Sequence, residues 1–300
     1  MKVLIAGATG FIGKALVRAF ISRGDEVIVL GRSKAKIAFV FEELPPYWTW
    51  IDLETQTDSI DLIINLAGEN IGGWWSKKKK EKLLNSRLAA IKRLIAFCHR
   101  QQNTAGHSPR LLQASGIGIY GLHGDRVYDE NSPLPQDLNF LSELSRNIEA
   151  AAFDAHSYNI PLLIMRFGIV LHANGGMLEQ LFPLFKYGFG TILGTGKQFL
   201  SWISRADLVK AILFLSDRPD LNGFINLVAK EPVTQAAFSK AYAKHLNRPL
   251  WLRFPPYMVK LLFGEMGTNL LLGSQKVIPT RLLEAGFDFE DPNLNYYFSK

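Results

Sequence analysis

Cysteine is nearly absent from this sequence, because Cys98 is the only one among 300 residues. A single cysteine cannot form an intramolecular disulfide, which excludes a disulfide-stabilised secreted scaffold and favours a reducing compartment. Long apolar runs are absent as well, since no stretch reaches the roughly 18 residues that a membrane-spanning helix needs. We therefore expect a cytoplasmic protein that has no membrane partner.

Several catalytic and binding signatures are also missing. The sequence has no cluster of cysteine and histidine at zinc-ligand spacing, so we expect no metal site. It has no Gly-x-Ser-x-Gly motif, which excludes the nucleophile turn of the common serine hydrolases. No basic helical stripe or aromatic platform argues strongly for nucleic acid, and we expect no nucleic-acid partner.

Charged residues make up only 20% of the chain, whereas hydrophobic residues make up 48%. This composition, without a low-complexity tract, argues against broad disorder and predicts a sizeable buried core. The net charge is +7 and the isoelectric point is near 9.4. Such a charge suits nucleic acid or acidic lipid, but it also suits an enzyme that holds a phosphorylated cofactor, which is the interpretation we favour.

Three glycines at three-residue spacing, Gly7, Gly10 and Gly13, stand between an apolar run at 2–6 and an apolar helical pattern that ends near Arg23. The pattern predicts a buried strand, a tight turn and a helix. Glycines let the backbone turn sharply and let a phosphate approach without a side chain in the way. The helix N-terminus offers unpaired N–H groups and the positive end of a dipole, so the turn predicts a pyrophosphate site. The alternative is a purely structural glycine turn.

The second predicted strand, at 26–30, ends in Gly31-Arg32-Ser33. In NAD sites an acidic residue at this position binds the ribose 2′-hydroxyl, whereas an arginine suits a 2′-phosphate. A guanidinium pairs with phosphate through charge-assisted and often bidentate hydrogen bonds. Arg32 and Ser33, with Lys36 as a further candidate, therefore predict NADP(H) as the cofactor. The alternative is a solvated basic loop.

Strand and helix patterns alternate through the first half of the chain. Further strands are predicted at 48–51, 61–68, 110–114, 161–166 and 167–171, and helices at 77–100, with Ser76 as N-cap, and 142–158. This alternation, with right-handed crossovers, predicts an α/β fold with a Rossmann-type, doubly wound parallel sheet. We interpret 37–47 as a connector, because Pro45-Pro46 excludes regular structure there.

The rest of the chain is less regular and predicts a second, smaller lobe. We assign 1–171 to an NADP-binding Rossmann domain that is rejoined by about 201–230. A smaller, mostly helical substrate lobe is expected from 172–200 and 231–300. The cleft between this lobe and the sheet is the predicted site for a small-molecule substrate.

Several specific stretches carry a resemblance to a known family. The glycine turn is similar to that of the extended short-chain dehydrogenase/reductase superfamily. More narrowly, the chain resembles the atypical epimerase-family proteins described as NADP-dependent oxidoreductases, with a small C-terminal domain. That narrower match rests on the stretches 65–71, Ser86-Arg87, 166–170, 194–203 and 279–287. The resemblance covers nearly the whole chain.

The resemblance implies a set of cofactor-binding residues, and the exit of the fourth strand adds to it, since Ala67-Gly68 leave room for a cofactor ribose. With Ser33 from the strand end above, the predicted cofactor-binding residues are Gly7, Gly10, Phe11, Ile12, Gly13, Arg32, Ser33, Leu66, Ala67, Gly68, Arg87 and Val170.

The chain departs from the superfamily where catalysis is expected. Members usually carry a tyrosine and, four residues later, a lysine that lowers the tyrosine pKa, so that the phenol acts as acid or base. Leu141 and Ser145 occupy the matching positions, and neither side chain can do that work. Ser115 and Tyr120 are the remaining candidates for polarising a carbonyl or handling a proton. Their alternative roles are as hydrogen-bonded turn or core residues.

Two hypotheses follow from the sequence. The first is an NADP(H)-dependent oxidoreductase or epimerase that acts on a small carbonyl or sugar-nucleotide-like substrate, with the hydride chemistry supplied by the cofactor. The second is an NADP(H)-binding sensor or interaction protein without turnover, which the missing tyrosine and lysine favour. We expect a monomer or a homodimer in either case.

Overall fold

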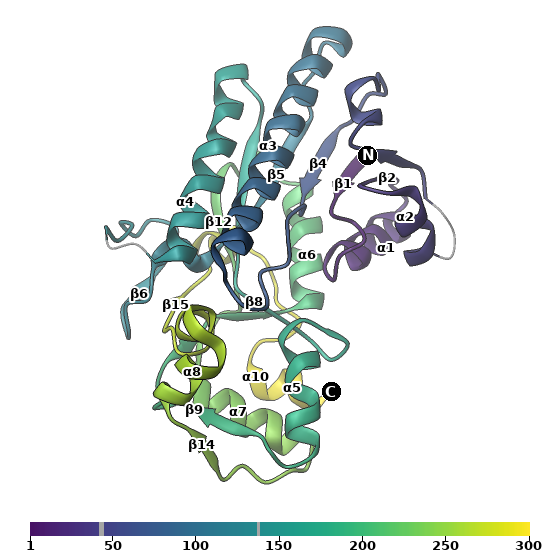
Figure 1. Cartoon of the computed structure of the whole chain (residues 1–300). Helices are drawn as coiled ribbons and strands as arrows, with labels where there is room; N and C mark the ends of the chain where they lie inside the picture. The colour runs from purple at the N-terminus through teal and green to yellow at the C-terminus, as the bar shows by residue number, and fades with distance from the viewer. Residues whose placement is uncertain (42–44, 137–138) are drawn as a thin grey trace.

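A seven-stranded parallel sheet forms the centre of the computed structural model, which describes residues 1–41, 45–136 and 139–300 (Figure 1). In spatial order its strands are β12 (Gly223–Leu227), β7 (Leu162–Phe167), β5 (Arg110–Gly116), β4 (Leu62–Asn65), β1 (Lys2–Ala6), β2 (Glu26–Gly31) and β3 (Tyr47–Thr49). Every neighbouring pair runs parallel. The chain builds the sheet outward in both directions from β1, so the predicted doubly wound α/β fold is confirmed.

Helices cover both faces of this sheet. They are α1 (Gly13–Arg23), α2 (Lys34–Val40) and α6 (Arg205–Ser216) on one face, and α3 (Lys77–Ala105) and α4 (Phe140–Phe153) on the other. Along β1 the side chains of Val3 and Ile5 pack with the first group, whereas those of Leu4 and Ala6 pack with the second. Burial on both faces explains why the strand sequences are continuously apolar rather than alternating.

The glycine turn between β1 and α1 forms as predicted. Gly7 has a φ of 79°, and a Cβ there would lie 2.7 Å from the backbone carbonyl carbon of Leu66. A Cβ on Gly13 would lie 2.4 Å from the carbonyl oxygen of Gly7. Only glycine fits either position, because the backbones of the turn, the helix and β4 approach so closely. The helix ends at Arg23, as predicted, and Gly24, whose φ is 92°, follows as its C-cap.

The connector predicted at 37–47 is partly wrong. Residues 34–40 form α2, and the buried side chain of Ile37 packs under Gly31 at the end of β2. The helix ends at Val40, before the two prolines, and 42–44 lie outside the described residues. The N-cap of α3 is confirmed, since the Ser76 hydroxyl accepts from the backbone N–H of Lys79 at 3.2 Å.

A smaller lobe packs below the carboxyl edge of the sheet (Figure 1). Its main helices are α5 (Gly176–Lys186), α7 (Gln235–His245), α8 (Pro256–Met266), η4 (Gly267–Leu271) and α10 (Leu294–Ser299). Short strands pair as β8 (Ile169–His172) with β11 (Trp202–Ser204), β9 (Thr191–Leu193) with β14 (Leu252–Phe254), β10 (Phe199–Leu200) with β13 (Val233–Thr234), and β6 (Val127–Tyr128) with β15 (Lys276–Val277). The remaining short helices are α9 (Thr280–Glu284), η1 (Asp52–Glu54), η2 (Ile117–Tyr120) and η3 (Asp154–Tyr158). The smaller, mostly helical lobe is confirmed, and its residue boundaries stay a prediction.

In the ranges that the structure describes, no helix combines the length and the apolar character that crossing a membrane would require.

Candidate functional site

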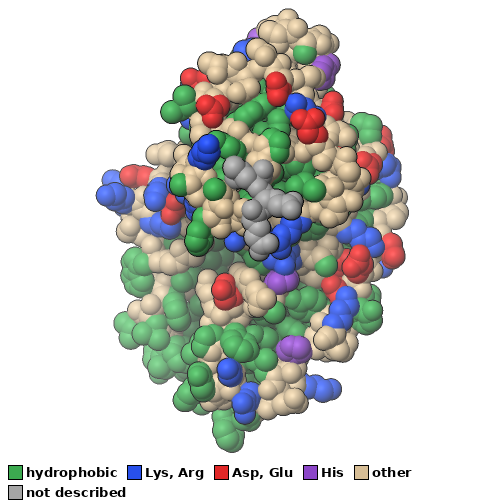
Figure 2. Space-filling model, turned by 90° about the vertical axis from the view of Figure 1, so that its right-hand side faces the viewer, with side chains coloured by type: hydrophobic (Ala, Val, Ile, Leu, Met, Phe, Trp, Pro, Cys, Tyr) green, Lys and Arg blue, Asp and Glu red, His purple; other side chains and the backbone are tan. Residues whose placement is uncertain are grey.

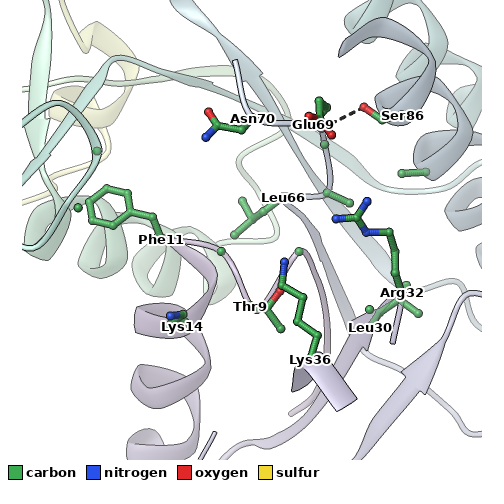
Figure 3. A pocket seen from close by; sticks show the side chains of 18 of the residues that line it. Thr9, Phe11, Lys14, Leu30, Arg32, Lys36, Leu66, Glu69, Asn70 and Ser86 are labelled. Carbon is green, nitrogen blue, oxygen red and sulfur yellow. Dashed lines mark hydrogen bonds between the residues drawn. The ribbon is translucent and has the colours of Figure 1, made fainter. Parts of the chain in front are cut away.

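A cleft of about 1180 Å³ opens where β1, β2 and β4 end, at the point from which the sheet is built in both directions (Figure 3). Open α/β sheets bind ligands at this place. The cleft is lined by Gly7, Thr9, Gly10, Phe11, Lys14, Leu30, Gly31, Arg32, Lys36, Trp50, Leu66, Ala67, Gly68, Glu69, Asn70, Lys82, Ser86, Ala89, Ala90, Arg93, Asn174, Gly175, Gly176, Glu179, Gln180 and Arg205.

The floor of the cleft is the glycine turn with the start of α1. The residue before this helix, Ile12, provides no side-chain hydrogen bond to its first N–H groups, and the first turn carries no acidic residue. The backbone N–H groups of Lys14 and Leu16 already donate to the carbonyl oxygens of Gly10 and Ile12, both at 3.1 Å. The N-terminus of α1 still directs the positive end of its dipole toward the cleft, and Lys14 adds a cation at the cleft wall. An anionic group such as a pyrophosphate suits this floor.

The cleft has a strongly positive lining. Its cations are Lys14, Arg32, Lys36, Lys82, Arg93 and Arg205, and its acids are Glu69 and Glu179. Glu69 is already neutralised, because Lys79 and Lys82 lie 2.8 and 3.2 Å from its carboxylate oxygens. The hydrogen bond from Lys79 also holds the pKa of Glu69 below its usual value. The excess of positive charge predicts a ligand that carries several negative charges.

Two of these cations stand together at the β2 side of the cleft. Figure 3 shows the side chains of Arg32, just after β2, and Lys36, from α2, both reaching into the cleft near Leu30. Within the described part of the chain neither makes a hydrogen bond or an ion pair. A planar guanidinium beside a mobile ammonium can hold one phosphate from two directions.

The structure brings together seven of the predicted cofactor-binding residues. They are Gly7, Gly10, Phe11, Arg32, Leu66, Ala67 and Gly68. Five others do not line the cleft. Gly13 is buried beneath the turn, Ile12 and Val170 pack on the core, and Ser33 is exposed at the start of α2.

Arg87, the fifth, lies behind the cleft wall. Its guanidinium donates to the backbone carbonyl oxygens of Leu83, at 2.8 Å, and Glu69, at 3.1 Å. It also lies under Gly68, where a Cβ would come within 2.9 Å of its Cζ. Burial lowers the pKa of this guanidinium. Arg87 therefore braces the loop that forms the wall, and a direct contact with a cofactor stays a prediction.

At the opposite end of the cleft, Phe11 packs against the small lobe. A Cβ on Gly175 would lie 2.2 Å from the Phe11 ring, so the ring rests directly on that backbone. The Arg205 guanidinium lies 5.2 Å from the centre of the same ring and 2.6 Å from Nε2 of His172. Burial is the main factor that lowers the pKa of His172, and the Arg205 charge adds to it. Nδ1 of the same ring accepts from the backbone N–H of Asn174 at 3.0 Å, so the imidazole is fixed beside Arg205 at the cleft wall.

Sequence reasoning missed one wall of the cleft, which comes from α3. Lys82, Ser86, Ala89 and Arg93 follow one another at spacings of three and four residues and so share one face of this helix. The spacing was visible in the sequence, but nothing local indicated which face of the helix meets the glycine turn.

The predicted catalytic residues Ser115 and Tyr120 lie outside the lining of the cleft, in a buried polar network. The Ser115 hydroxyl donates to Glu149 at 2.9 Å, and Arg166 donates to both Glu149 oxygens at 2.9 and 2.8 Å. Arg166 also donates to the Tyr120 hydroxyl, which donates to Asn226 at 2.9 Å. The network joins three strands, β5, β7 and β12, with the helices α4 and η2.

The chemistry of this network does not favour proton transfer by Tyr120. The side chain is 1% exposed, and burial raises its pKa to about 12. An acid or base works best when its pKa lies near the operating pH. The position that usually carries the catalytic tyrosine, Leu141, packs in an apolar cluster with Trp75 and Leu83. Catalytic roles for Ser115 and Tyr120 stay predictions.

No three histidine, cysteine, aspartate or glutamate side chains gather as a metal site within 1–41, 45–136 and 139–300.

Comparisons with known proteins agree with this geometry. A model of the NAD dependent epimerase/dehydratase family matches residues 3–227, and a domain of unknown function (DUF1731) matches 254–298. The Mycobacterium bovis protein named epimerase family protein Mb2239 is 37% identical over 96% of this chain and 93% of its own length. A chloroplastic Arabidopsis thaliana homolog of epimerase family protein SDR39U1 is 33% identical over 97% of this chain and 83% of its own. The crystal structure of human SDR39U1 (isoform 2) with NADPH superposes with a TM-score of 0.87 at 31% identity, covering 99% of this chain and 98% of that one.

Proposed function

The chain belongs to the NAD dependent epimerase/dehydratase family, as its sequence motifs indicated, and we propose that it binds NADP(H) in the cleft above the glycine turn. The pyrophosphate would lie against the N-terminus of α1, and Arg32 with Lys36 would hold the 2′-phosphate. The observation that carries this proposal is the pair of open cations, Arg32 and Lys36, at the end of β2. The human structure, which contains NADPH, supports it.

The charge of the cleft favours NADP(H) over NAD(H). The 2′-phosphate adds about two negative charges, and phosphate groups of this kind bind best to charge-assisted donors. The segment that ends β2 contributes Arg32 and no acidic residue to the lining, and the two acids of the described lining, Glu69 and Glu179, come from other elements. A carboxylate at the end of β2 would be needed to select the ribose 2′-hydroxyl of NAD(H).

The test is a titration of wild-type protein and of Arg32→Ala with NADPH and NADH. A hydrogen bond between charged groups contributes about 1.5–3 kcal/mol, so Arg32→Ala should weaken NADPH binding by roughly tenfold to a hundredfold. NADH affinity should change little. Lys77→Ala is the matched control, because Lys77 is exposed on α3 and makes no ion pair with a described residue. Equal losses for NADPH and NADH would contradict the assignment of the 2′-phosphate to Arg32.

We propose further that the bound cofactor serves an oxidoreductase or epimerase reaction on a small carbonyl or sugar-nucleotide-like substrate. The nicotinamide supplies hydride exchange. The chain's own contribution would be to hold the cofactor and to exclude water between the two lobes. Ser115 is the candidate for polarising a carbonyl, since its side chain is only partly buried.

A second candidate function is supported by the site itself. Leu141 and Ser145 replace the usual tyrosine and lysine, and Tyr120 is buried with a pKa of about 12. These observations favour a sensor that binds NADP(H) and catalyses no reaction with it. The two candidates separate in an NADPH oxidation assay with a broad panel of carbonyl compounds. Oxidation above background that falls in Ser115→Ala supports the enzyme. Tight NADPH binding with no oxidation by any compound supports the sensor.

A further inference from the structure

The small lobe exposes an unusual number of large apolar side chains. Ten of them lie in two stretches, 182–189 and 251–263, and they are nearly half of those exposed in the described chain. We call this group, with the neighbouring cations named below, the lobe patch. Its apolar members are Phe182, Leu184, Tyr187, Phe189, Trp251, Leu252, Tyr257, Leu261, Leu262 and Phe263.

These side chains come from segments that adjoin in space. β14 pairs with β9, so the turn before β9 lies beside 248–252, and the two line a groove of about 510 Å³. The helix α8 follows β14 directly, and in it only Val259 is buried although most of its residues are apolar. Figure 2 views the molecule from the side of α5 and shows hydrophobic side chains over much of the lower lobe, whereas α8, on the left in Figure 1, lies on the far side of that view. An apolar surface of this kind on a globular protein marks an interaction site.

The charge on the lobe patch is of one sign. Its cations are Lys186, Lys240, Lys244, Arg248, Arg253 and Lys260, all exposed. None makes an ion pair with a described residue, in contrast to Lys79, Lys80 and Lys82 on α3. The sequence has no aspartate or glutamate in 180–190 or in 240–264. The surface therefore combines bare apolar groups with uncompensated positive charge.

We propose that the lobe patch docks the protein on an anionic membrane surface. Tryptophan and tyrosine are the residues enriched at the boundary between lipid and water, and lysine and arginine are attracted to anionic headgroups. Trp251, Tyr187 and Tyr257 are each at least 70% exposed, so their rings can reach that boundary without rearrangement. Leu261, 76% exposed on α8, can enter the acyl region beneath it.

Other occupants fit the patch less well. A second copy of the chain would bring unpaired cations against the same cations, which opposes association through this face. Nucleic acid would use the cations and the aromatic rings, but the exposed leucines of α5, β14 and α8 would find no partner in it. An acidic peptide could enter the groove at 186–189 and 248–252, but Leu261 and Leu262 are not part of that groove.

Docking through the lobe patch leaves the cleft free. No residue of the patch lines the cleft, which lies at the edge of the sheet between the lobes. The protein could therefore bind a cofactor while it rests on a surface. The proposal does not depend on the identity of that cofactor.

The test measures binding of the full chain to vesicles at physiological salt. We expect flotation with vesicles of phosphatidylcholine mixed with phosphatidylglycerol, and little with phosphatidylcholine alone. The double variant Lys186→Glu and Arg248→Glu should weaken binding at least about tenfold, because several attractive charges become repulsive. Trp251→Ala should weaken it as well.

The matched control variants make the same kinds of change, a double charge reversal and the removal of an aromatic ring, at exposed sites outside the lobe patch. Lys77→Glu with Lys78→Glu removes the same charge from exposed lysines of α3, and Phe39→Ala removes an aromatic ring that is 92% exposed. Both should bind vesicles as the wild type does. All variants should keep the wild-type unfolding midpoint, since every changed side chain is exposed. Absence of vesicle binding, equal losses in patch and control variants, or binding to nucleic acid or an acidic peptide instead of vesicles would overturn the proposal.

Discussion

Two pairs of charged side chains in the large lobe differ in their surroundings: one pair faces the cleft, and the other is buried. Arg32 and Lys36 stand open in the cleft without a described partner. Glu149 and Arg166 are almost fully buried and satisfy each other through two hydrogen bonds. Removing one member of such a buried pair leaves an uncompensated charge, which costs about 3–5 kcal/mol. The open cations are thus available to a ligand, whereas the buried pair serves stability.

Tyr120 belongs to the buried group, and its titration offers a test. Burial raises its pKa to about 12 from a usual value near 10, so the folded state favours the neutral phenol. Its contribution to the free energy of unfolding is fully present below about pH 10 and is lost as the pH rises through about 12. Tyr120→Phe should make the fall in stability across this window shallower. Denaturant unfolding at a series of pH values measures the slope of the free energy of unfolding against pH for each variant.

Two other tyrosines bear on this experiment, one as a further source of the slope and one as the site of a control substitution. Burial also raises the pKa of Tyr297 to about 12, so a slope should remain in Tyr120→Phe. Tyr296 is 48% exposed, and Tyr296→Phe should leave the slope as in the wild type. An unchanged slope in Tyr120→Phe would mean that this phenol is not buried as described.

At the scale of single residues, the sequence predicts position best where it follows from immediate neighbours. Arg32 lines the cleft, as its place directly after the second strand suggests, and its part in binding stays a prediction. Lys82 and Arg93 were missed because their part in the cleft depends on how α3 crosses the sheet. The pairing of Glu149 with Arg166 was not predicted, because the two residues lie in different elements.

At the scale of elements, the turn between β1 and α1 controls the cleft most directly. The open N-terminus of α1 exists only while the turn keeps its close path between Gly7 and Gly13. The sequence predicted this unit well, because its glycines, its strand and its helix are contiguous. It predicted α2 poorly, because a helix of seven residues next to two prolines has little periodicity to show.

The substitution Gly13→Ala should disrupt the turn. The added methyl group would lie 2.4 Å from the Gly7 carbonyl oxygen and 2.6 Å from Cα of Ala8, so the turn must open. We expect a loss of stability of about 1–3 kcal/mol, the general cost of overpacking, and NADPH binding weakened by roughly fivefold or more because the phosphate site is distorted. Nucleotide titration with a parallel unfolding curve measures it.

Gly106→Ala is a suitable control for that substitution. Gly106 ends α3 with a φ of 74°, and a Cβ there meets no atom within 4 Å. The substitution should cost about 1 kcal/mol of stability through backbone strain and leave NADPH binding intact. Equal effects of the two substitutions on binding would contradict the role given to the turn.

At the scale of the whole molecule, the two lobes share the cleft and are joined by polar contacts, one buried and one exposed. The Asp207 carboxylate, on α6, accepts from the backbone N–H groups of Glu290 and Asp291 at 2.7 and 3.0 Å. On the other side Lys80 of α3 pairs with Glu265 of α8. These contacts link segments far apart in the sequence, so the sequence could predict a second lobe but not how it docks.

The lobe patch also exists only at this scale. Its apolar and positive residues lie in stretches separated by about fifty positions (189 to 240), and each stretch alone resembles an ordinary core element. We expected no membrane partner from the sequence because that expectation rested on the absence of one long, continuous apolar run. The stretches come together only in the folded chain, where β9 pairs with β14.

The most direct measurement of the central claim is the ratio of NADPH to NADH affinity of the wild-type protein, by calorimetric titration at physiological salt. The account predicts that NADPH binds at least about tenfold more tightly, since the 2′-phosphate gains charge-assisted contacts with Arg32 and Lys36. Raising the salt concentration should narrow this ratio, because the added contacts are ionic. Equal affinities, or no binding of either nucleotide, would contradict the account.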